Sequence, residues 1–194
     1  MTQVSIAELV AGVRSGRVVS FPTDTVPALA ALPEKAELIF ETKQRRQDKP
    51  LILMAGAAAD LWDYVQGTKE EYQIWQRVTE KYWPGGLTLV LPASKRLPKQ
   101  MNPLDPTTIG IRVPNSEIAR SILAQTGPLA TTSANLSGQA PLGSMVEIAA
   151  QFPTVLTLAL TEFPASQGAT GIPSTVAKWT SSGWQILRQG AVRL

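Results

Sequence analysis

The sequence predicts an α/β fold of the mixed, α+β-like kind, in which helices flank a twisted sheet of parallel and antiparallel strands. Helical and strand-like segments alternate along the chain, a pattern that places helices on the faces of a sheet. Residues 174–179 and 184–188 have the pattern of a hairpin, so part of the sheet must be antiparallel. With 194 residues, of which 44% are hydrophobic, the chain can bury a sizeable core. We therefore expect residues 1–194 to form a single domain.

The expected helices begin at capping residues or at a proline in the first turn. In chain order these starts are Ser5, Pro33, Thr68, Asn115 or Ser116, and Ser144. Ser5, Thr68 and Ser144 each stand three residues before a glutamate, which is the capping-box pattern. A further short helix is expected over residues 57–65. The helix after Thr68 carries an aromatic stripe, Tyr72, Trp75 and Tyr82, whose spacing is more typical of a core face than of a base-stacking surface.

The expected strands are short apolar runs between the helices. They cover residues 18–21, 51–54, 87–91, 109–114, 129–132 and 155–160, followed by the hairpin. The Leu-Ile-Leu-Met run at 51–54 has no polar alternation, which is typical of a strand buried on both faces. Residues 92–108 and 161–173 are expected to be irregular loops.

Cysteine is absent and so is histidine. This excludes disulfides, thiolate and imidazole chemistry and nearly every zinc site, and we expect no metal held by protein side chains alone. Chemistry must rest on Lys, Arg, carboxylates, hydroxyls, amides and the backbone. The net charge of +3 permits nucleic-acid binding without requiring it. No apolar run is long enough to span a bilayer, and the N-terminus has no signal-peptide pattern, so we expect a cytoplasmic protein.

A run of cations follows the second expected helix. It contains Lys43, Arg45, Arg46 and Lys49, which repel one another. One interpretation is a solvated connection whose charges offset the negative end of the helix dipole. The other is an anion that lies against the run and supplies the countercharge. The run alone favours the first interpretation, so the remaining segments must decide.

Hydroxyl and amide side chains follow several expected strands. Thr23 and Thr25 flank an aspartate, and Ser133 and Asn135 lie in a loop of small polar residues. Such groups, together with backbone N–H groups, can bind phosphate or carboxylate. Ordinary turns with Asx-type hydrogen bonds use the same residue types. These loops are therefore candidates for an anion site, and each is a weak signal by itself.

Taken together, these segments resemble the YrdC/Sua5 family in its short single-domain form. The motifs that carry the resemblance are, in order, Pro22–Thr25, Lys43-x-Arg45, Trp83–Thr88, Arg112–Pro114, Ser133-x-Asn135, Ser174–Val176 and Arg188-x-Gly190. Each motif alone is weak, whereas their number and order are specific. They extend over residues 21–190, which is nearly the whole chain.

The resemblance implies a nucleotidyltransferase that makes threonylcarbamoyl-AMP from L-threonine, bicarbonate and ATP and releases pyrophosphate. The product would serve N6-threonylcarbamoyladenosine modification of tRNA, with partner proteins for the transfer step. Mg²⁺ is expected to bind through the phosphates. An enzyme without His or Cys can do this chemistry by positioning and cationic stabilisation.

The resemblance also implies roles for particular residues, since Arg suits bidentate contacts with phosphate and Lys acts as a point charge. The implied catalytic residues are Lys43, Arg45, Ser133 and Asn135. The implied phosphate contacts are these four with Arg112, Thr131, Ser174 and Arg188. Thr23 and Thr25 would hold the amino acid.

The chain departs from the family pattern at a few positions. Pro27 and Ala28 stand where the family has Tyr and Gly, and Arg46 stands where proline is common. These departures bear on threonine recognition more than on nucleotide binding. Two alternatives therefore stay open: a non-enzymatic module that binds double-stranded RNA through the same cations, and a related family branch that acts on another small substrate.

Overall fold

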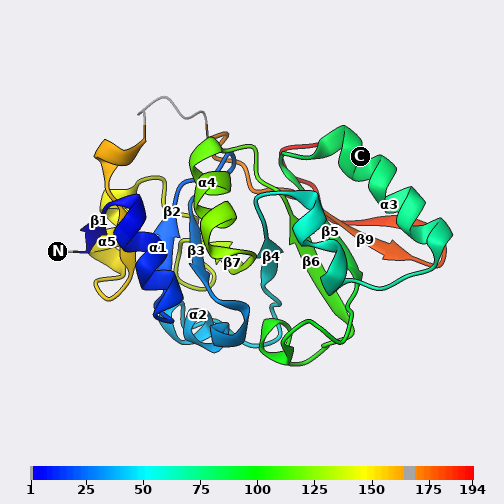
Figure 1. Ribbon diagram of the computed structural model, residues 1–194, viewed down its shortest axis with the longest axis horizontal. Coiled ribbons are helices and arrows are strands. Elements are labelled where there is room, and N and C mark those ends of the chain that lie inside the picture. The colour runs from blue at the N-terminus through cyan, green and yellow to red at the C-terminus, as the bar shows by residue number, and fades with distance from the viewer. Residues whose placement is uncertain (1, 164–168) are drawn as a thin grey trace.

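The computed structural model describes residues 2–163 and 169–194. Within these residues, ten strands form one sheet in the order β1-β8-β2-β3-β7-β4-β6-β5-β9-β10, with helices packed around it (Figure 1). The strands are β1 Gln3–Val4, β2 Val19–Phe21, β3 Ala28–Ala31, β4 Ile52–Met54, β5 Leu87–Pro92, β6 Thr108–Arg112, β7 Leu129–Ser133, β8 Leu156–Leu158, β9 Thr175–Thr180 and β10 Gly183–Arg188. The helices are α1 Ile6–Arg14, α2 Glu37–Thr42, α3 Lys69–Tyr82, α4 Glu117–Thr126 and α5 Met145–Gln151.

The sheet is mixed, which confirms the predicted fold class. Parallel pairs join β1 to β8, β8 to β2, β4 to β6 and β5 to β9. The other neighbouring pairs are antiparallel, including the predicted hairpin of β9 and β10. In Figure 1 the chain passes back and forth between the two halves of the sheet, so that segments distant in sequence meet at its centre.

The predicted side-chain caps are present, whereas the helix expected from Pro33 begins with a 3-10 turn, Pro33–Lys35, and α2 itself starts at Glu37. The side chains of Ser5, Thr68 and Ser144 each accept a hydrogen bond from the backbone N–H of the third helical residue. The glutamate at that third position accepts one in turn from the backbone N–H of the cap residue. Ser116 caps α4, and Gly127 ends it with a φ of 78°. The aromatic stripe of α3 is a core face as expected, because Trp75 is fully buried and Tyr72 and Tyr82 pack against the same core. Local sequence is sufficient to predict the structure at these positions, because capping and periodicity involve residues of one helix only.

The prediction of a helix over residues 57–65 is wrong. Two single 3-10 turns, Ala58–Asp60 and Trp62–Tyr64, replace it. The end of this segment is held to β5 instead, because the N–H of Gln66 donates to Pro92 O at 2.9 Å and that of Ser94 donates to Tyr64 O at 2.9 Å. Neither turn has a side-chain cap, so pairing with β5 outweighs a weak helical tendency.

Strand β3 was not predicted from the sequence. Its Ala-Leu-Ala-Ala composition has low strand propensity, and tertiary pairing with β2 on one side and β7 on the other makes it a strand. The strand expected over 155–160 is confined to β8, after which Leu160–Glu162 forms a 3-10 turn. Of the loop expected over 161–173, residues 164–168 lie outside the described residues.

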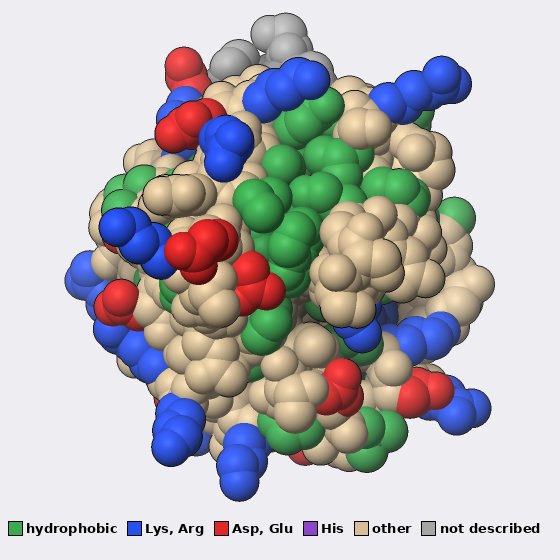
Figure 2. Space-filling model, turned by 90° about the vertical axis from the view of Figure 1, so that its right-hand side faces the viewer, with side chains coloured by type: hydrophobic (Ala, Val, Ile, Leu, Met, Phe, Trp, Pro, Cys, Tyr) green, Lys and Arg blue, Asp and Glu red, His purple; other side chains and the backbone are tan. Residues whose placement is uncertain are grey.

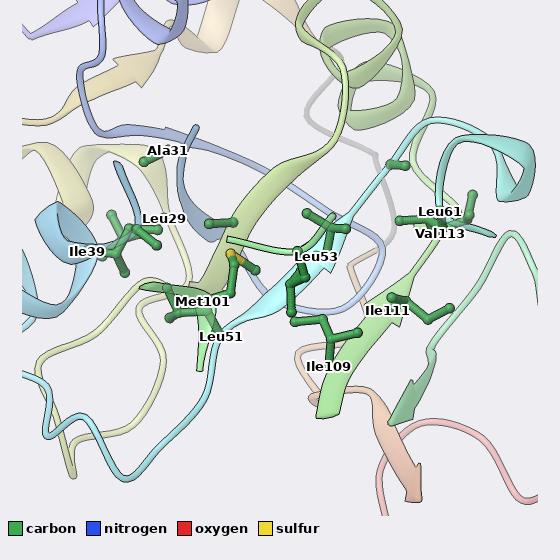
Figure 3. Packing of buried hydrophobic residues seen from close by; sticks show 14 of the residues in the cluster. Leu29, Ala31, Ile39, Leu51, Leu53, Leu61, Met101, Ile109, Ile111 and Val113 are labelled. Carbon is green, nitrogen blue, oxygen red and sulfur yellow. The ribbon is translucent and has the colours of Figure 1, made fainter. Parts of the chain in front are cut away.

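The central strands present two different faces. Leu53 of β4 and Ile111 of β6 point into the main hydrophobic core with Leu29 and Ile39, as Figure 3 shows. A second cluster lies under α1 and α4. The expectation that residues 51–54 are buried in core on both faces is wrong at Ile52, because this side chain lines a cavity. Side chains alternate along a strand, so the face opposite Leu53 is available for binding.

The end of the molecule that carries α3 is rich in aromatic residues. Trp62, Tyr72, Trp75, Trp179 and Trp184 form a chain of ring contacts with centroid separations of 5.0–6.3 Å. On this side of the molecule hydrophobic side chains reach the surface as one patch, with Lys and Arg side chains at its margins (Figure 2). None of these aromatic rings lines the cavity described below, so their role is packing. No helix in the described part of the chain is long and apolar enough to cross a bilayer.

Candidate active site

A cavity of about 650 Å³ lies on one face of the central strands. Ile52 of β4 is paired with Thr131 of β7 and with Gly110 of β6, and all three line the cavity. Their sequence neighbours Leu53, Ala130 and Ile111 belong to the core. Because directly paired residues point to the same face, the register of these strands assembles one cavity wall from distant segments.

The cavity collects nearly all the residues that the sequence predicted for a site. Those on its wall are Thr23, Thr25, Arg45, Arg112, Thr131, Ser133, Asn135, Ser174 and Arg188. The exception is Lys43, which does not line the cavity and is only 1% exposed. Strand ends and the loops after them thus meet at one place, as the spacing of the motifs alone could not show.

The conformation of the chain at the end of α2 places Arg45 on the cavity wall. Gln44 adopts a left-handed φ of 49°, and the N–H of Arg45 donates to Phe40 O at 2.8 Å while that of Gln44 donates to Glu41 O at 3.1 Å. This is a Schellman motif with glutamine in the usual glycine position. Arg45 Nε then donates to Lys49 O at 2.9 Å and Nη2 to Pro50 O at 3.0 Å, so the guanidinium is fixed at the rim.

Arg188 and Ser174 form a second polar corner of the wall. Arg188 donates from Nε and Nη2 to Ser174 O at 3.1 and 2.9 Å, and Ser174 Oγ lies 2.8 Å from Thr88 Oγ1. A Cβ on Gly190 would lie 2.1 Å from Pro173 O. The glycine of the Arg-x-Gly motif is therefore required for close approach of the two backbones.

Arg112 is held by a buried ion pair that sequence reasoning did not assign. Its Nη2 donates to Asp24 Oδ1 at 2.6 Å, Nη1 to Thr25 Oγ1 at 2.9 Å and Nε to Gly85 O at 3.0 Å. The two side chains are 5% and 14% exposed. Arg112 thus fixes the Thr23–Thr25 loop against β6. In the sequence, the signal for a role of Asp24 was its position between two threonines. The cation that pairs with it, Arg112, stands at the end of β6 and is distant in the chain.

Ser133 and Asn135 form a compact hydrogen-bonded turn with Lys43. Ser133 Oγ donates to Asn135 Oδ1 at 2.6 Å, and the Asn135 amide nitrogen donates to Leu136 O at 2.7 Å and Gln139 O at 2.8 Å. Lys43 Nζ donates to Ser133 O, to Ser133 Oγ and to Asn135 Oδ1. The solvated interpretation of the cationic run is therefore wrong at Lys43, whereas Arg46 is exposed and pairs with Asp48.

The electrostatics of the site are positive on balance, because Arg45, Arg112, Arg188 and Lys178 line the cavity beside the carboxylates of Asp48 and Asp105. Of Lys43, Arg45, Arg112 and Arg188, only Arg112 has a carboxylate at ion-pair distance among the described residues. Burial lowers the pKa of Arg45 and of Arg188; at Arg45 the charge of Asp48 opposes this lowering and the charge of Arg188 adds to it. Burial, followed by Arg45 and Lys49, lowers the pKa of Lys43 to about 7. A bound anion would relieve this accumulated repulsion.

The described residues contain no group of three or more Asp or Glu side chains that could hold a metal ion. Within the site, Asp24 is engaged by Arg112. Beside the carboxylates of Asp48 and Asp105, the wall carries guanidinium, ammonium, hydroxyl and amide donors, which bind anionic oxygens.

The comparisons with known proteins agree with this geometry. Residues 12–190 match the Sua5/YciO/YrdC family model, described as telomere recombination. The threonylcarbamoyl-AMP synthase of Pyrococcus abyssi is 34% identical over 187 residues, which are 94% of this chain and 53% of that protein. The protein of the same name from Vibrio vulnificus is 30% identical over 190 residues, 96% of this chain and 98% of that protein. The crystal structure of P. abyssi Sua5 complexed with L-threonine superimposes with a TM-score of 0.83 at 30% identity and covers 95% of this chain and 54% of that one.

The chain spans about half the length of the first of these relatives. The match nevertheless covers strands β2 to β10 and every residue that lines the cavity, because it extends from the last turn of α1 to the end of the β9–β10 hairpin. The chain therefore belongs to the Sua5/YciO/YrdC family.

Proposed function

We propose that this chain is a nucleotidyltransferase that forms threonylcarbamoyl-AMP from L-threonine, bicarbonate and ATP. The threonine amine captures bicarbonate to give a carbamate and water. A carbamate oxygen then attacks the α-phosphorus of ATP, and pyrophosphate leaves. Relatives of this chain bear the name of this activity, and one of them is solved with L-threonine bound.

The observation that carries the proposal is the positive cavity. In the part of the chain that the structure describes, Arg45 and Arg188 face it with no carboxylate at ion-pair distance. A carbamate, a triphosphate and pyrophosphate are all anions. Bringing two anions together for the attack requires countercharge and fixed positions more than it requires a covalent nucleophile. Arginine supplies both, because its planar guanidinium binds two oxygens at once.

The remaining polar wall residues take the oxygens of the reacting groups. In this proposal Ser133, Asn135, Thr131 and Ser174 bind phosphate and carbamate oxygens, and Arg188 binds the phosphates. Arg112 lines the cavity, and its guanidinium also keeps the neighbouring loop in place.

The threonine end of the site is assigned to the loop that Arg112 holds. Thr23 Oγ1 donates to Val26 O at 2.8 Å, and Thr25 Oγ1 accepts from Arg112. Both hydroxyls are thereby oriented before a substrate enters. Pro27 and Ala28 also line the cavity, so the departures from the family pattern lie where they would shape recognition of the amino acid.

Mg²⁺ is proposed to enter with the nucleotide. The wall offers few carboxylates to it, which suits an ion held mainly by phosphate oxygens and water. The proposal also includes tRNA as the acceptor of the product, through the proteins of the transfer step, and places the reaction in the cytoplasm where tRNA is used.

The test is pyrophosphate release by the purified chain with ATP, bicarbonate and L-threonine. We expect release that depends on threonine, and a loss of about a hundredfold in Arg45→Ala. Arg46→Ala is the matched control, because the same change is made one residue later on a side chain that is 79% exposed; its activity should equal that of the unaltered chain.

Two outcomes would overturn the proposal. Release that is equal with and without threonine would indicate a branch with another substrate. Salt-sensitive binding of double-stranded RNA without any turnover would favour the RNA-binding alternative.

A further inference from the structure

Strand β10 forms one edge of the sheet, and its outer side has no neighbouring strand within residues 2–163 and 169–194. The strand order ends with β5-β9-β10, and β10 pairs with β9 alone. An edge strand presents a row of unpaired backbone N–H and C=O groups, which another extended segment can pair with. The sheet is therefore open to extension at β10.

The two edges of the sheet differ in their protection against such pairing. β1, at the opposite edge, has only two residues, and a very short edge strand is itself a protective device. β10 has six residues, Gly183–Arg188, with neither proline nor lysine among them. A bulge interrupts it between Ile186 and Arg188, so residues 183–186 are its regular part. This part carries no device that would prevent pairing.

The apolar side chains of β10 lie on the face of the sheet that α3 covers. Trp184 is paired with Trp179, and their rings are 5.0 Å apart. Ile186 is paired with Ala177, a core residue, yet its own side chain is 43% exposed. Hydrophobic side chains reach the surface on this side of the molecule (Figure 2). An apolar side chain placed beyond the edge would continue the packing of Trp184.

We propose that this edge is an interface between two copies of the chain, in which β10 pairs antiparallel with β10 of a second copy about a two-fold axis at Gln185. A two-fold interface uses the same surface on both copies. This register places Gln185 opposite Gln185, and Trp184 of each copy opposite Ile186 of the other. Directly opposed residues share a face, so both apolar pairs extend the α3 side. The proposal does not rest on the proposed function.

The nearby charges permit the pairing of two identical strands. Residues 183–187 carry no charged side chain, so no like charges stand directly opposite each other. Lys178 lies beside Gln185 on β9, and three strand spacings, about 14 Å in total, separate it from Lys178 of the second copy. This separation exceeds the Debye length of about 8 Å at physiological salt. Self-pairing is therefore compatible with the positive charge of the chain.

A neighbouring register is less favourable than the one proposed. Pairing centred on Ile186 would place Trp184 opposite Arg188, whose Nε and Nη2 already donate to Ser174 O at 3.1 and 2.9 Å. It would also extend across the bulge. The register centred on Gln185 leaves Arg188 beyond the bulge, on the cavity wall.

The interface would border the cavity. In the proposed register Gly183 of the second copy lies opposite Leu187, which lines the cavity and is 53% exposed. The turn between β9 and β10 of one copy would thus stand beside the cavity of the other.

The first test is sedimentation velocity of the unaltered chain from about 1 to 100 μM, a range suited to a small interface. We expect a reversible monomer–dimer equilibrium. Ile186→Lys should raise the dissociation constant by about tenfold or more, because it removes both apolar pairs and places a lysine on the edge. Val146→Lys is the matched control, since Val146 is 54% exposed on α5, which packs near β8 at the other end of the sheet. It should dimerise like the unaltered chain.

Two outcomes of the first test would overturn the proposal. One is dimerisation of Ile186→Lys that equals that of the unaltered chain. The other is an unaltered chain that stays monomeric over the whole range, which would leave the open edge to a strand of a different protein.

The second test determines the register by cross-linking. The chain has no cysteine, so Gln185→Cys, Ile186→Cys and Leu187→Cys each introduce a single thiol at an exposed position. A disulfide requires Cβ atoms about 3.5–4.5 Å apart. In the proposed register residue 185 lies opposite itself, whereas residues 186 and 187 are displaced from their own copies by two and four positions along the strand.

We expect Gln185→Cys to form a disulfide-linked dimer under mild oxidation at least about tenfold faster than the other two variants. The difference should disappear in denaturant, where the strands are not paired. Equal rates in the folded variants would indicate random collision, and a faster reaction of Ile186→Cys or Leu187→Cys would indicate another register. Either result would overturn the proposal.

Discussion

The two faces of the central strands share one backbone and differ in what they present. On the core face, Leu53 and Ile111 are fully buried in an aliphatic cluster. On the cavity face, their neighbours Ile52 and Gly110 line a space edged by arginines and hydroxyls. The strands are anchored by the first face, so the second can carry polar and small residues without loss of the fold. Whether a residue of these strands serves the core or the cavity therefore depends on which of the two alternating positions it occupies along its strand.

Arg112 gives the largest expected effect and tests whether the cavity face is free of structural roles. We expect Arg112→Met to lower the free energy of unfolding by about 3–5 kcal/mol, because it leaves Asp24 buried without its cation. Urea unfolding measures the loss. Adding Asp24→Asn should recover part of it, since the uncompensated charge is then removed; a loss below about 1 kcal/mol in the single variant would contradict the structural role.

Leu53 and Ile52 test the comparison directly, because they are adjacent and point to opposite faces. We expect Leu53→Ala to lower the free energy of unfolding by about 2–5 kcal/mol through a core cavity, with pyrophosphate affinity unchanged below the transition. The same truncation at Ile52 should cost less stability and should alter pyrophosphate affinity. Equal stability losses at both positions would show that alternation along the strand does not separate a structural face from a binding face.

Lys43 lies on neither face, and its titration should make stability depend on pH. Its pKa is lowered to about 7 in the folded chain, by burial first and then by Arg45 and Lys49, whereas an unfolded lysine titrates near 10.4. Between these values the unfolded chain binds more protons, so stability rises with pH by up to about 1.4 kcal/mol per pH unit. Below pH 7 the penalty is fully present.

The measurement for Lys43 is the free energy of unfolding of the unaltered chain minus that of Lys43→Met, from pH 6 to pH 10. Subtraction removes the contributions of other titrating groups. We expect a difference that is constant at the acidic end and shifts in favour of the unaltered chain as the pH rises. A flat difference over the whole range would mean that Lys43 keeps an ordinary pKa.

Gln44 gives the smallest expected effect and concerns the turn that sends Lys43 inward and Arg45 to the cavity. Because its φ is 49°, Gln44→Gly should relieve strain and raise the free energy of unfolding by about 1 kcal/mol. Thermal unfolding measures the gain. Gln44→Val is the opposing control, since a β-branched residue is disfavoured at positive φ, and a stability equal to that of Gln44→Gly would contradict this reading of the turn.

Parts of the structure that depend on neighbours in sequence were predictable. Ser5, Thr68 and Ser144 identified helix starts because a cap acts over three residues. Strand β3 and the 3-10 turns of residues 58–64 were not predictable, since pairing with distant strands overrides weak local preferences. Asp24 was passed over for the same reason: only the fold brings Arg112 to it.

The sequence by itself determined the alternation of helices and strands, the absence of thiol and imidazole chemistry, and the ordered motifs that indicate the family. Tertiary structure decided what each motif residue does. Lys43 and Arg45 belong to one short motif, yet one is enclosed by Ser133 and Asn135 and the other faces the cavity. The physical reason is that periodicity and capping are local, whereas burial, strand register and the direction of a side chain depend on segments far away in the chain.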